Sequence, residues 1–208
     1  MKFIIAAFIL VSFTLRAQTP AEFNHDTYQP TYTLPAPEGW GIERFPIPIE
    51  FAPSIPYKGV EDVRFAPGWG NPKSEDYWSY AFLWYLDGKV DITAETTEKN
   101  LTAYYSGLVG RNIEPRKIPK EKLVPVKVSM KKTTTAKDDL KTFSGTIAML
   151  DYMEQKPITF NCVVHVKACP GKENNTFVFT QISPKPVEDK VWTELQKLWT
   201  GFDCSVKK

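Results

Sequence analysis

One segment, residues 77–86, limits what this 208-residue chain can fold into more than any other. Read as a β-strand, it places large apolar side chains on both of its faces. Trp78, Tyr80, Phe82, Trp84 and Leu86 lie on one face, and Tyr77, Ala81, Leu83 and Tyr85 lie on the other. A strand that is apolar on both faces has to be covered on both faces. The segment therefore predicts a central strand with further elements packed on each side of its sheet.

Shorter strand patterns surround this segment. Two precede it, at residues 42–49, which prolines restrict to an edge, and at residues 60–65. Asp87-Gly88 resembles a hairpin turn, so residues 90–94 are expected to pair back onto the central strand. Four further strands, joined mainly by short turns, are expected as antiparallel hairpins at residues 124–130, 142–152, 158–168 and 176–182.

Two segments have the apolar spacing of a helix. The first covers residues 97–109, with Thr96 or Thr97 as its cap and Gly110 as its stop, and the second covers residues 187–200 and ends at Gly201. The sequence thus predicts an α+β fold, a twisted and mostly antiparallel sheet of about seven strands with two main helices packed against it.

The N-terminus has the pattern of a secretory signal peptide, residues 1–17, with a short basic start and an apolar run. We expect cleavage after Ala17, with Ala21 as the alternative site and an uncleaved anchor as the other interpretation. The mature chain would be periplasmic or secreted, with no membrane span. Residues 18–38 are rich in proline and are expected to be an extended or disordered lead segment, followed by a single domain at residues 39–208.

Charge argues against nucleic acid as a partner. Removal of Lys2 and Arg16 with the signal reduces the 26 Lys and Arg to 24, which equals the 24 Asp and Glu. Nucleic-acid-binding domains usually carry a basic excess. One stretch, residues 111–141, is nevertheless basic, and it indicates either a solvated face or a surface for an anionic partner such as an acidic glycan.

Three cysteines remain, and an oxidising compartment would favour pairing two of them. Cys162 lies within a strand pattern, whereas Cys169 follows that strand at a turn and Cys204 follows the last helix. We therefore expect a disulfide between Cys169 and Cys204, the alternative being three free thiols. Their spacing gives no redox pair or zinc site.

The order of these elements, together with the closing stretch Trp192-Thr-Glu-Leu-Gln-Lys-Leu-Trp-Thr-Gly-Phe202, resembles the PsbP-like α/β fold over about residues 40–204. Domains of that family mostly dock and bind, so the resemblance implies a binding role but identifies no site residue. The N-terminus and its Ala17-Gln18 junction are also similar to those of uncharacterised exported proteins of Bacteroidetes type.

No catalytic motif, cofactor loop or metal-ligand spacing is present in the sequence, and no cofactor is expected. His25 lies in the lead segment, and His165 is expected to be an ordinary strand residue. A hydrolase would need two carboxylates facing each other, and the candidates are Asp76, Asp87, Asp91 and Asp151.

Aromatic residues give the more promising signal. Trp40 and Trp69 lie in glycine-rich loops, where they could stack on a sugar ring or a partner side chain, and Tyr77 and Tyr85 lie nearby in the sequence. The expected function is an exported, non-catalytic binding or docking domain for an envelope protein or glycan. The alternatives are a carbohydrate-binding module that uses the loop tryptophans and a carboxylate-dependent hydrolase.

Overall fold

A computed structural model describes residues 23–24 and 27–205 of the protein; the predicted signal segment, its cleavage positions and His25 lie outside them. The described residues form one antiparallel sheet in the order β1-β2-β3-β7-β6-β5-β4. Its strands are β1 (Gly41–Ile47), β2 (Gly59–Phe65), β3 (Tyr80–Asp87), β4 (Lys127–Lys132), β5 (Lys141–Asp151), β6 (Lys156–Lys167) and β7 (Asn175–Ser183). The predicted α+β class, with about seven antiparallel strands and two main helices, is confirmed.

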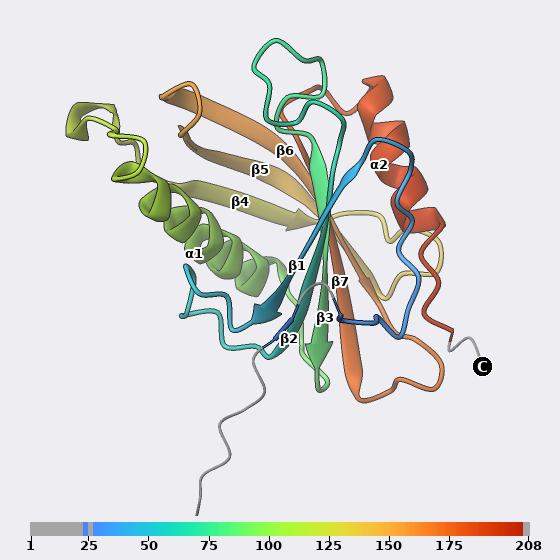
Figure 1. Cartoon of the computed structure of the whole chain (residues 1–208). Helices are drawn as coiled ribbons and strands as arrows, with labels where there is room; N and C mark the ends of the chain where they lie inside the picture. The colour runs from blue at the N-terminus through green and yellow to red at the C-terminus, as the bar shows by residue number, and fades with distance from the viewer. Residues whose placement is uncertain (1–22, 25–26, 206–208) are drawn as a thin grey trace, which may run out of the picture.

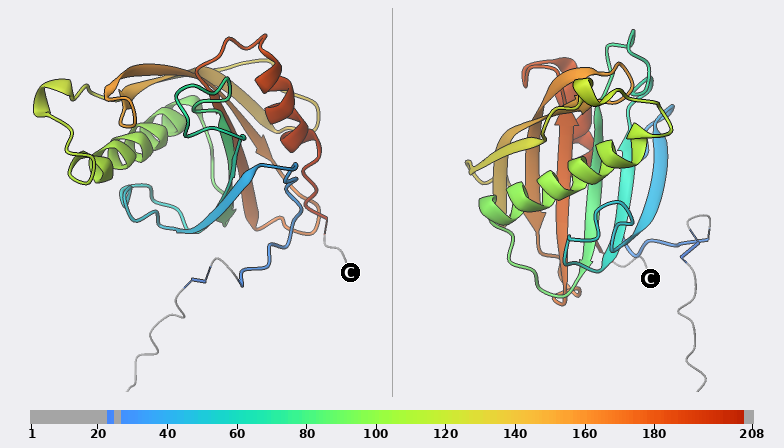
Figure 2. Two further views of the ribbon diagram at one scale, coloured as in Figure 1. Left: turned by 45° about the horizontal axis from the view of Figure 1, so that its top comes forward. Right: turned by 90° about the vertical axis from the view of Figure 1, so that its left-hand side faces the viewer.

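The two helices cover opposite faces of this sheet (Figure 1). Helix α1 (Ala94–Ile113) crosses one face, as the right-hand view of Figure 2 shows, and α2 (Lys190–Thr200) lies on the other. A short 3-10 turn, Lys120–Lys122, follows α1. Each helix buries an apolar stripe, which gives two cores: the α1-side core around Leu101, Tyr104 and Tyr105, and the α2-side core around Leu195 and Leu198.

Strand β3 separates these cores, as predicted. It lies between β2 and β7, with Phe82 in the α1-side core and Leu83 in the α2-side core. The strand begins at Tyr80 and not at Tyr77, because Trp78 has a positive φ of 57° and residues 75–78 form a turn. The Trp78 ring is still buried, at 1% exposure.

The segment before Gly39 is more ordered than predicted. The chain runs extended there, but Tyr32 and Leu34 are buried in the α2-side core, and Thr33 forms a bridge with Asp203. Buried Arg64 on β2 donates to the carbonyl oxygens of Leu34 and Pro35 and pairs with Asp62. The proline content suggested disorder because these partners are distant in the sequence.

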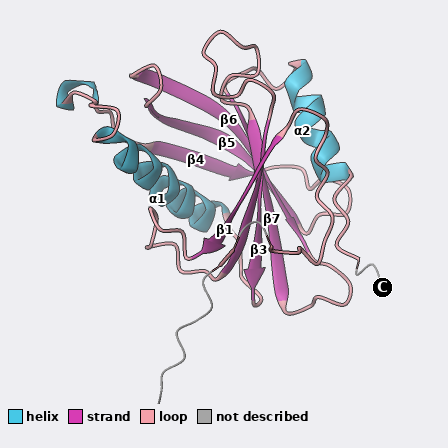
Figure 3. Ribbon diagram, in the orientation of Figure 1, coloured by secondary structure: helices cyan, strands magenta, loops and turns pink. Residues whose placement is uncertain are grey.

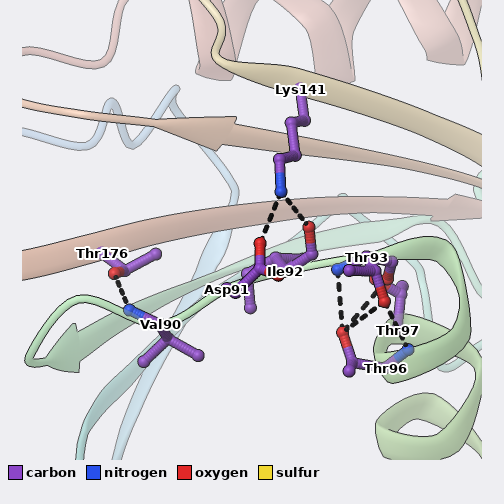
Figure 4. Close-up of polar contacts among 8 residues, drawn as sticks. All are labelled: Val90, Asp91, Ile92, Thr93, Thr96, Thr97, Lys141 and Thr176. Atoms are coloured by element: carbon purple, nitrogen blue, oxygen red, sulfur yellow. Dashed lines mark hydrogen bonds and ion pairs between the residues drawn. The ribbon is translucent and has the colours of Figure 1, made fainter.

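The return strand predicted at residues 90–94 is wrong. Both edges of β3 are already occupied by β2 and β7, so this segment leads directly into α1. Figure 4 shows its contacts: the Val90 amide donates to Thr176, and the Lys141 ammonium binds Asp91 and the Ile92 carbonyl oxygen. The connection is therefore held by side chains instead of strand pairing.

Helix α1 is longer than predicted at both ends. Its cap is Thr93 and not Thr96 or Thr97, because the Thr93 side chain accepts from the Thr96 amide while Thr96 bonds back to the Thr93 amide (Figure 4). The helix also continues through Gly110 to Ile113. The loops and turns that connect the elements are distinguished in Figure 3.

A disulfide joins Cys169, after β6, to Cys204, after α2, the pair favoured by the sequence. Cys162 is a buried free thiol in the α1-side core. Across the described part of the chain, neither helix combines the length and the apolar character that a membrane crossing requires.

Candidate functional site

A pocket of about 290 Å³ opens between α1 and the first three strands of the sheet. Eight of its thirteen lining residues are aromatic, and we call it the aromatic pocket. Its lining consists of Glu43, Phe45, Phe51, Val63, Phe65, Trp69, Trp78, Tyr80, Tyr104, Leu108, Arg111, Asn112 and Tyr152. Its volume is near the lower end of the roughly 300–1,000 Å³ typical of ligand sites, so it suits a small ligand.

The register of β1 and β2 explains one wall of this pocket. Glu43 lies opposite Val63, and Phe45 lies opposite Glu61, so the four side chains share the face that α1 covers. Phe65 on the same face stacks on Trp69, with ring centroids 4.3 Å apart. The two strands thus present two rings, one aliphatic side chain and one carboxylate to the pocket.

The opposite wall comes from α1 and from the segment between β1 and β2. Gly107 allows the helix to approach this segment, because a Cβ atom there would lie 1.8 Å from the Phe51 carbonyl oxygen. The Phe51 ring packs edge-on against Tyr104 at 5.1 Å. The close backbone contact fixes the position of Phe51 at the pocket.

Two tyrosine hydroxyls at the pocket are already engaged. Tyr104 donates to Glu61 at 2.8 Å, and the Tyr80 hydroxyl bonds that of Tyr105 at 2.5 Å. Burial raises the pKa of Tyr80 and of Tyr104 well above the usual value, so both stay neutral. These residues therefore offer rings to a ligand, and neither supplies a phenolate for chemistry.

The lining has two charged groups and one amide, and they come from both walls. Glu43 comes from the sheet, whereas Arg111 and Asn112 come from the last turn of α1. The Arg111 guanidinium lies over the Phe51 ring, 5.2 Å from its centroid. Both Glu43 and Arg111 are exposed, so they mark the side of the pocket that meets solvent.

Of the four aromatic residues predicted as a site, the structure places only Trp69 in this pocket. Trp69 and Trp40 are both half-buried, but Trp69 packs on the α1-side core and Trp40 packs on the α2-side core. The two indoles therefore do not form one stacking platform, because the sheet separates the cores against which they pack.

Tyr77 and Tyr85 are also apart from each other. The Tyr77 hydroxyl donates to both oxygens of Asp151, at 3.0 and 2.8 Å, and burial followed by this bond raises its pKa. Tyr85 faces the α2-side core, where it stacks on Phe177 with centroids 4.9 Å apart. Both rings have packing roles within the fold.

The four candidate carboxylates lie at two ends of the sheet. Asp87 is the last residue of β3 and Asp91 follows it, whereas Asp76 precedes the start of the strand. Asp151 is fully buried and accepts from Tyr77 and from the Met153 and Glu154 amides, which makes it a turn cap. None of the four lines the aromatic pocket.

His165 is more than an ordinary strand residue. It is buried, and its Nδ1 lies 2.7 Å from Asp139, which also accepts from Thr142 and from the Trp199 indole. This group attaches the β4–β5 loop to β6 and α2. Sequence reasoning missed the pair because Asp139 is 26 residues away in a loop.

The basic stretch is distributed over several elements of the fold. Its first residue, Arg111, lines the aromatic pocket, while Lys127, Lys131 and Lys132 lie exposed on β4 at the edge of the sheet. Lysines on an edge strand oppose pairing with another chain. The exposed lysines of β4 therefore protect this edge of the sheet from pairing with another chain.

A second pocket of about 480 Å³ lies near Lys89, Leu140 and Lys167, beside the Asp91–Lys141 pair shown in Figure 4. No aromatic ring lines it. One of its two acidic residues, Asp91, already binds Lys141 at 2.6 Å. It therefore offers a ligand less specific contact than the aromatic pocket does.

Apart from Trp69, the residues that line the aromatic pocket were not predicted from the sequence, although α1 carries a signal for some of them. The helical stripe through Tyr104 and Leu108 continues to Arg111 and Asn112, where it changes from apolar to polar. Such a change at the end of a buried stripe is consistent with a pocket that opens to solvent. Phe51 and Tyr152 had no comparable signal, since they arrive from irregular segments.

Within the described residues, no group of three or more His, Cys, Asp or Glu side chains is placed to hold a metal ion. Comparison with protein-family models, with curated proteins and with solved structures found no match to this chain.

Proposed function

We propose that this protein is an exported, non-catalytic binding domain and that its ligand occupies the aromatic pocket. The observation that carries the proposal is a cavity of about 290 Å³, walled by eight aromatic rings and open on the side where Glu43 and Arg111 lie. Aromatic walls with a few polar groups are typical of small-molecule sites. The residues of the lining supply no nucleophile with an adjacent base, which favours binding over turnover.

Two further features support export and a binding role. The N-terminal signal pattern and the Cys169–Cys204 disulfide both suit an oxidising compartment, periplasmic or extracellular. The PsbP-like resemblance rests on the order of the elements, three strands, a helix, four strands and a closing helix. We include that resemblance, and the similarity to exported Bacteroidetes proteins, in the proposal.

Fluorine NMR of the mature protein labelled with 5-fluorotryptophan tests the pocket directly. The chain has six tryptophans, of which Trp69 and Trp78 line the pocket and Trp40, Trp192 and Trp199 pack on the other face. Titration with indole should shift the Trp69 and Trp78 signals saturably. Replacement of each tryptophan by phenylalanine assigns the signals.

A filled pocket provides the control. Leu108→Phe adds volume to the lining and should abolish the shifts, whereas Leu123→Phe, at an exposed position outside the lining, should leave them unchanged. Absence of saturable shifts at Trp69 and Trp78, or shifts confined to the α2-side tryptophans, would contradict the proposal.

A further inference from the structure

Arg111 differs from the other arginines that the structure describes. Those three have a carboxylate or amide partner, in the pairs Arg44–Asp62, Arg64–Asp62 and Arg116–Asn112. Within residues 23–24 and 27–205, the Arg111 guanidinium has no such partner. A guanidinium carries five N–H donors. Arg111, which lines the aromatic pocket, therefore has donors and a charge to offer to a ligand.

The guanidinium also lies close to the aromatic walls. Its central carbon is 5.2 Å from the centroid of the Phe51 ring, and this ring packs edge-on against Tyr104 with centroids 5.1 Å apart. All three residues line the pocket. A ligand ring that packs beside Phe51 would thus have Arg111 within reach of an acidic group on a short linker.

The other charged or amide residues of the lining are already engaged. The Asn112 side chain accepts from Arg116 at 3.1 Å and donates to the Leu108 carbonyl oxygen at 2.8 Å. Glu43 has an interaction of its own in the structure. The charge of Arg111 is therefore the feature of the lining that selects among ligands, and it favours an anion.

The ring of Tyr152 reports the balance of charge at the pocket. Burial raises the pKa of its phenol to about 12. Among the smaller influences, Arg116 and Arg111 lower the pKa, and Asp151 and Glu43 raise it, with Glu43 acting least of the four. Asp151 lies outside the lining and caps a turn. Both guanidiniums thus act on this pocket ring more strongly than the Glu43 carboxylate does.

The rest of the lining defines the remainder of the ligand. A guanidinium binds a carboxylate through two parallel hydrogen bonds. The Glu43 charge in the same lining opposes a second negative charge on the ligand, so a single carboxylate fits best. The stacked pair Phe65 and Trp69 offers a flat surface to a ring. The volume of about 290 Å³ limits the ligand to one or two rings.

We propose that the aromatic pocket takes a small aromatic monocarboxylate, with its ring system beside Phe51 within the aromatic walls and its carboxylate on Arg111. This inference rests on the proposed binding function. It makes Arg111 the residue that determines specificity for an anion.

The test compares four probes on the fluorotryptophan-labelled mature protein: indole, indole-3-acetate, indole-3-acetamide and tryptamine. Indole-3-acetate should bind about tenfold more tightly than the acetamide, which has the same shape without the charge. Tryptamine, a cation, should bind no more tightly than the acetamide. Added salt should narrow the difference, because Arg111 is exposed. Equal affinity for the acetate and the acetamide, or a preference for tryptamine, would overturn the assignment.

Substitutions identify the group that holds the carboxylate. Arg111→Gln should weaken indole-3-acetate by about tenfold, to the level of the acetamide, and leave indole unaffected. Arg111→Lys keeps the charge without the paired hydrogen bonds, so it should retain part of the preference. The matched control is Arg116→Gln, at an exposed position outside the lining, which should cost much less. Equal losses in Arg111→Gln and Arg116→Gln would show a general positive field instead of a contact with Arg111, and would overturn the assignment.

A carboxylate beside an aromatic ring also occurs at the carboxyl end of a peptide, which N-acetyl-L-tryptophan represents. Because the pocket holds only one or two rings, the added acetamide group should make this probe bind less tightly than indole-3-acetate. Tighter binding of N-acetyl-L-tryptophan would identify a peptide end as the ligand and contradict a small free acid.

Indole distinguishes the failure of this inference from the failure of the proposed function. If indole binds at Trp69 and Trp78 but indole-3-acetate binds no better than indole, the pocket is a binding site and the carboxylate assignment is wrong. If neither indole nor indole-3-acetate binds, both proposals fail.

Discussion

At the residue scale, Glu61 gives the sharpest prediction about stability. It lies on β2 beneath α1, is fully buried, and accepts a hydrogen bond from Tyr104 at 2.8 Å. Burial raises its pKa from the usual 4.5 to about 8, so Glu61 is protonated in the folded protein at pH 7 but ionised in the unfolded chain. The stability that this group contributes is therefore fully present below pH 4.5 and is lost as pH rises through 8.

We expect the free energy of unfolding to fall by about 3 kcal/mol from this group between pH 5 and pH 8, on the scale of 1.36 kcal/mol per pKa unit. Glu61→Gln keeps the shape and a hydrogen bond to Tyr104 but does not ionise, so this fall should disappear. Urea unfolding followed by circular dichroism at several pH values measures it. Glu50→Gln, at an exposed position, should behave as the unsubstituted protein does. Parallel pH curves for the protein and Glu61→Gln would show that burial does not shift this carboxyl.

At the element scale, α1 depends on one close approach. A Cβ at Gly107 would lie 1.8 Å from the Phe51 carbonyl oxygen, whereas one at Gly110, a turn later, meets no atom within 4 Å. Gly107→Ala should therefore destabilise the protein by about 2 kcal/mol, as overpacking does, and weaken indole binding by moving Phe51. Gly110→Ala should stabilise it by up to about 1 kcal/mol, since alanine favours helix. Chemical denaturation of both variants measures the contrast, and equal effects would refute the close packing.

The same helix shows how far sequence reasoning reaches. Its apolar stripe was predictable, because Leu101, Tyr104 and Tyr105 repeat at helical spacing, and so was the two-faced strand β3. Its start was not, because the cap at Thr93 depends on a reciprocal bond with Thr96. Gly110 failed as a stop because the cost of a glycine in a helix, about 1 kcal/mol, is outweighed when the rest of the helix is packed.

At the scale of the whole molecule, the approximate number of strands and the packing of elements on both faces of the sheet could be predicted, because both follow from the periodicity of apolar residues. The aromatic pocket could not, because it forms where β1, α1 and two irregular segments meet. Trp69 was singled out by its loop, yet its partner Phe65 and the charges of Glu43 and Arg111 become neighbours only through the register and the helix position. Trp40, chosen for the same reason, packs on the other core.

This division into two faces leads to a prediction about the disulfide. Cys169 and Cys204 are 35 residues apart and enclose β7 and α2, so their bond ties the α2 layer to the sheet. Closing a loop of this length stabilises a fold by about 4 kcal/mol in the chain-entropy description. Reduction should therefore lower the unfolding midpoint markedly. The aromatic pocket is on the opposite face, so indole should still bind below the new midpoint.

Thermal unfolding with and without a reducing agent, combined with the indole titration, tests both parts. A Cys169→Ser/Cys204→Ser double variant should unfold at the lower midpoint in either condition, which shows that Cys162 does not contribute. Phe202, two residues before Cys204, stacks on Trp199 in the α2-side core, which also contains Trp192. The fluorine signals of Trp192 and Trp199 should therefore change on reduction while those of Trp69 and Trp78 stay in place. Loss of indole binding in a reduced protein that is still folded would mean that the two faces are coupled through the sheet, and the pocket could not then be treated as independent of the α2 layer.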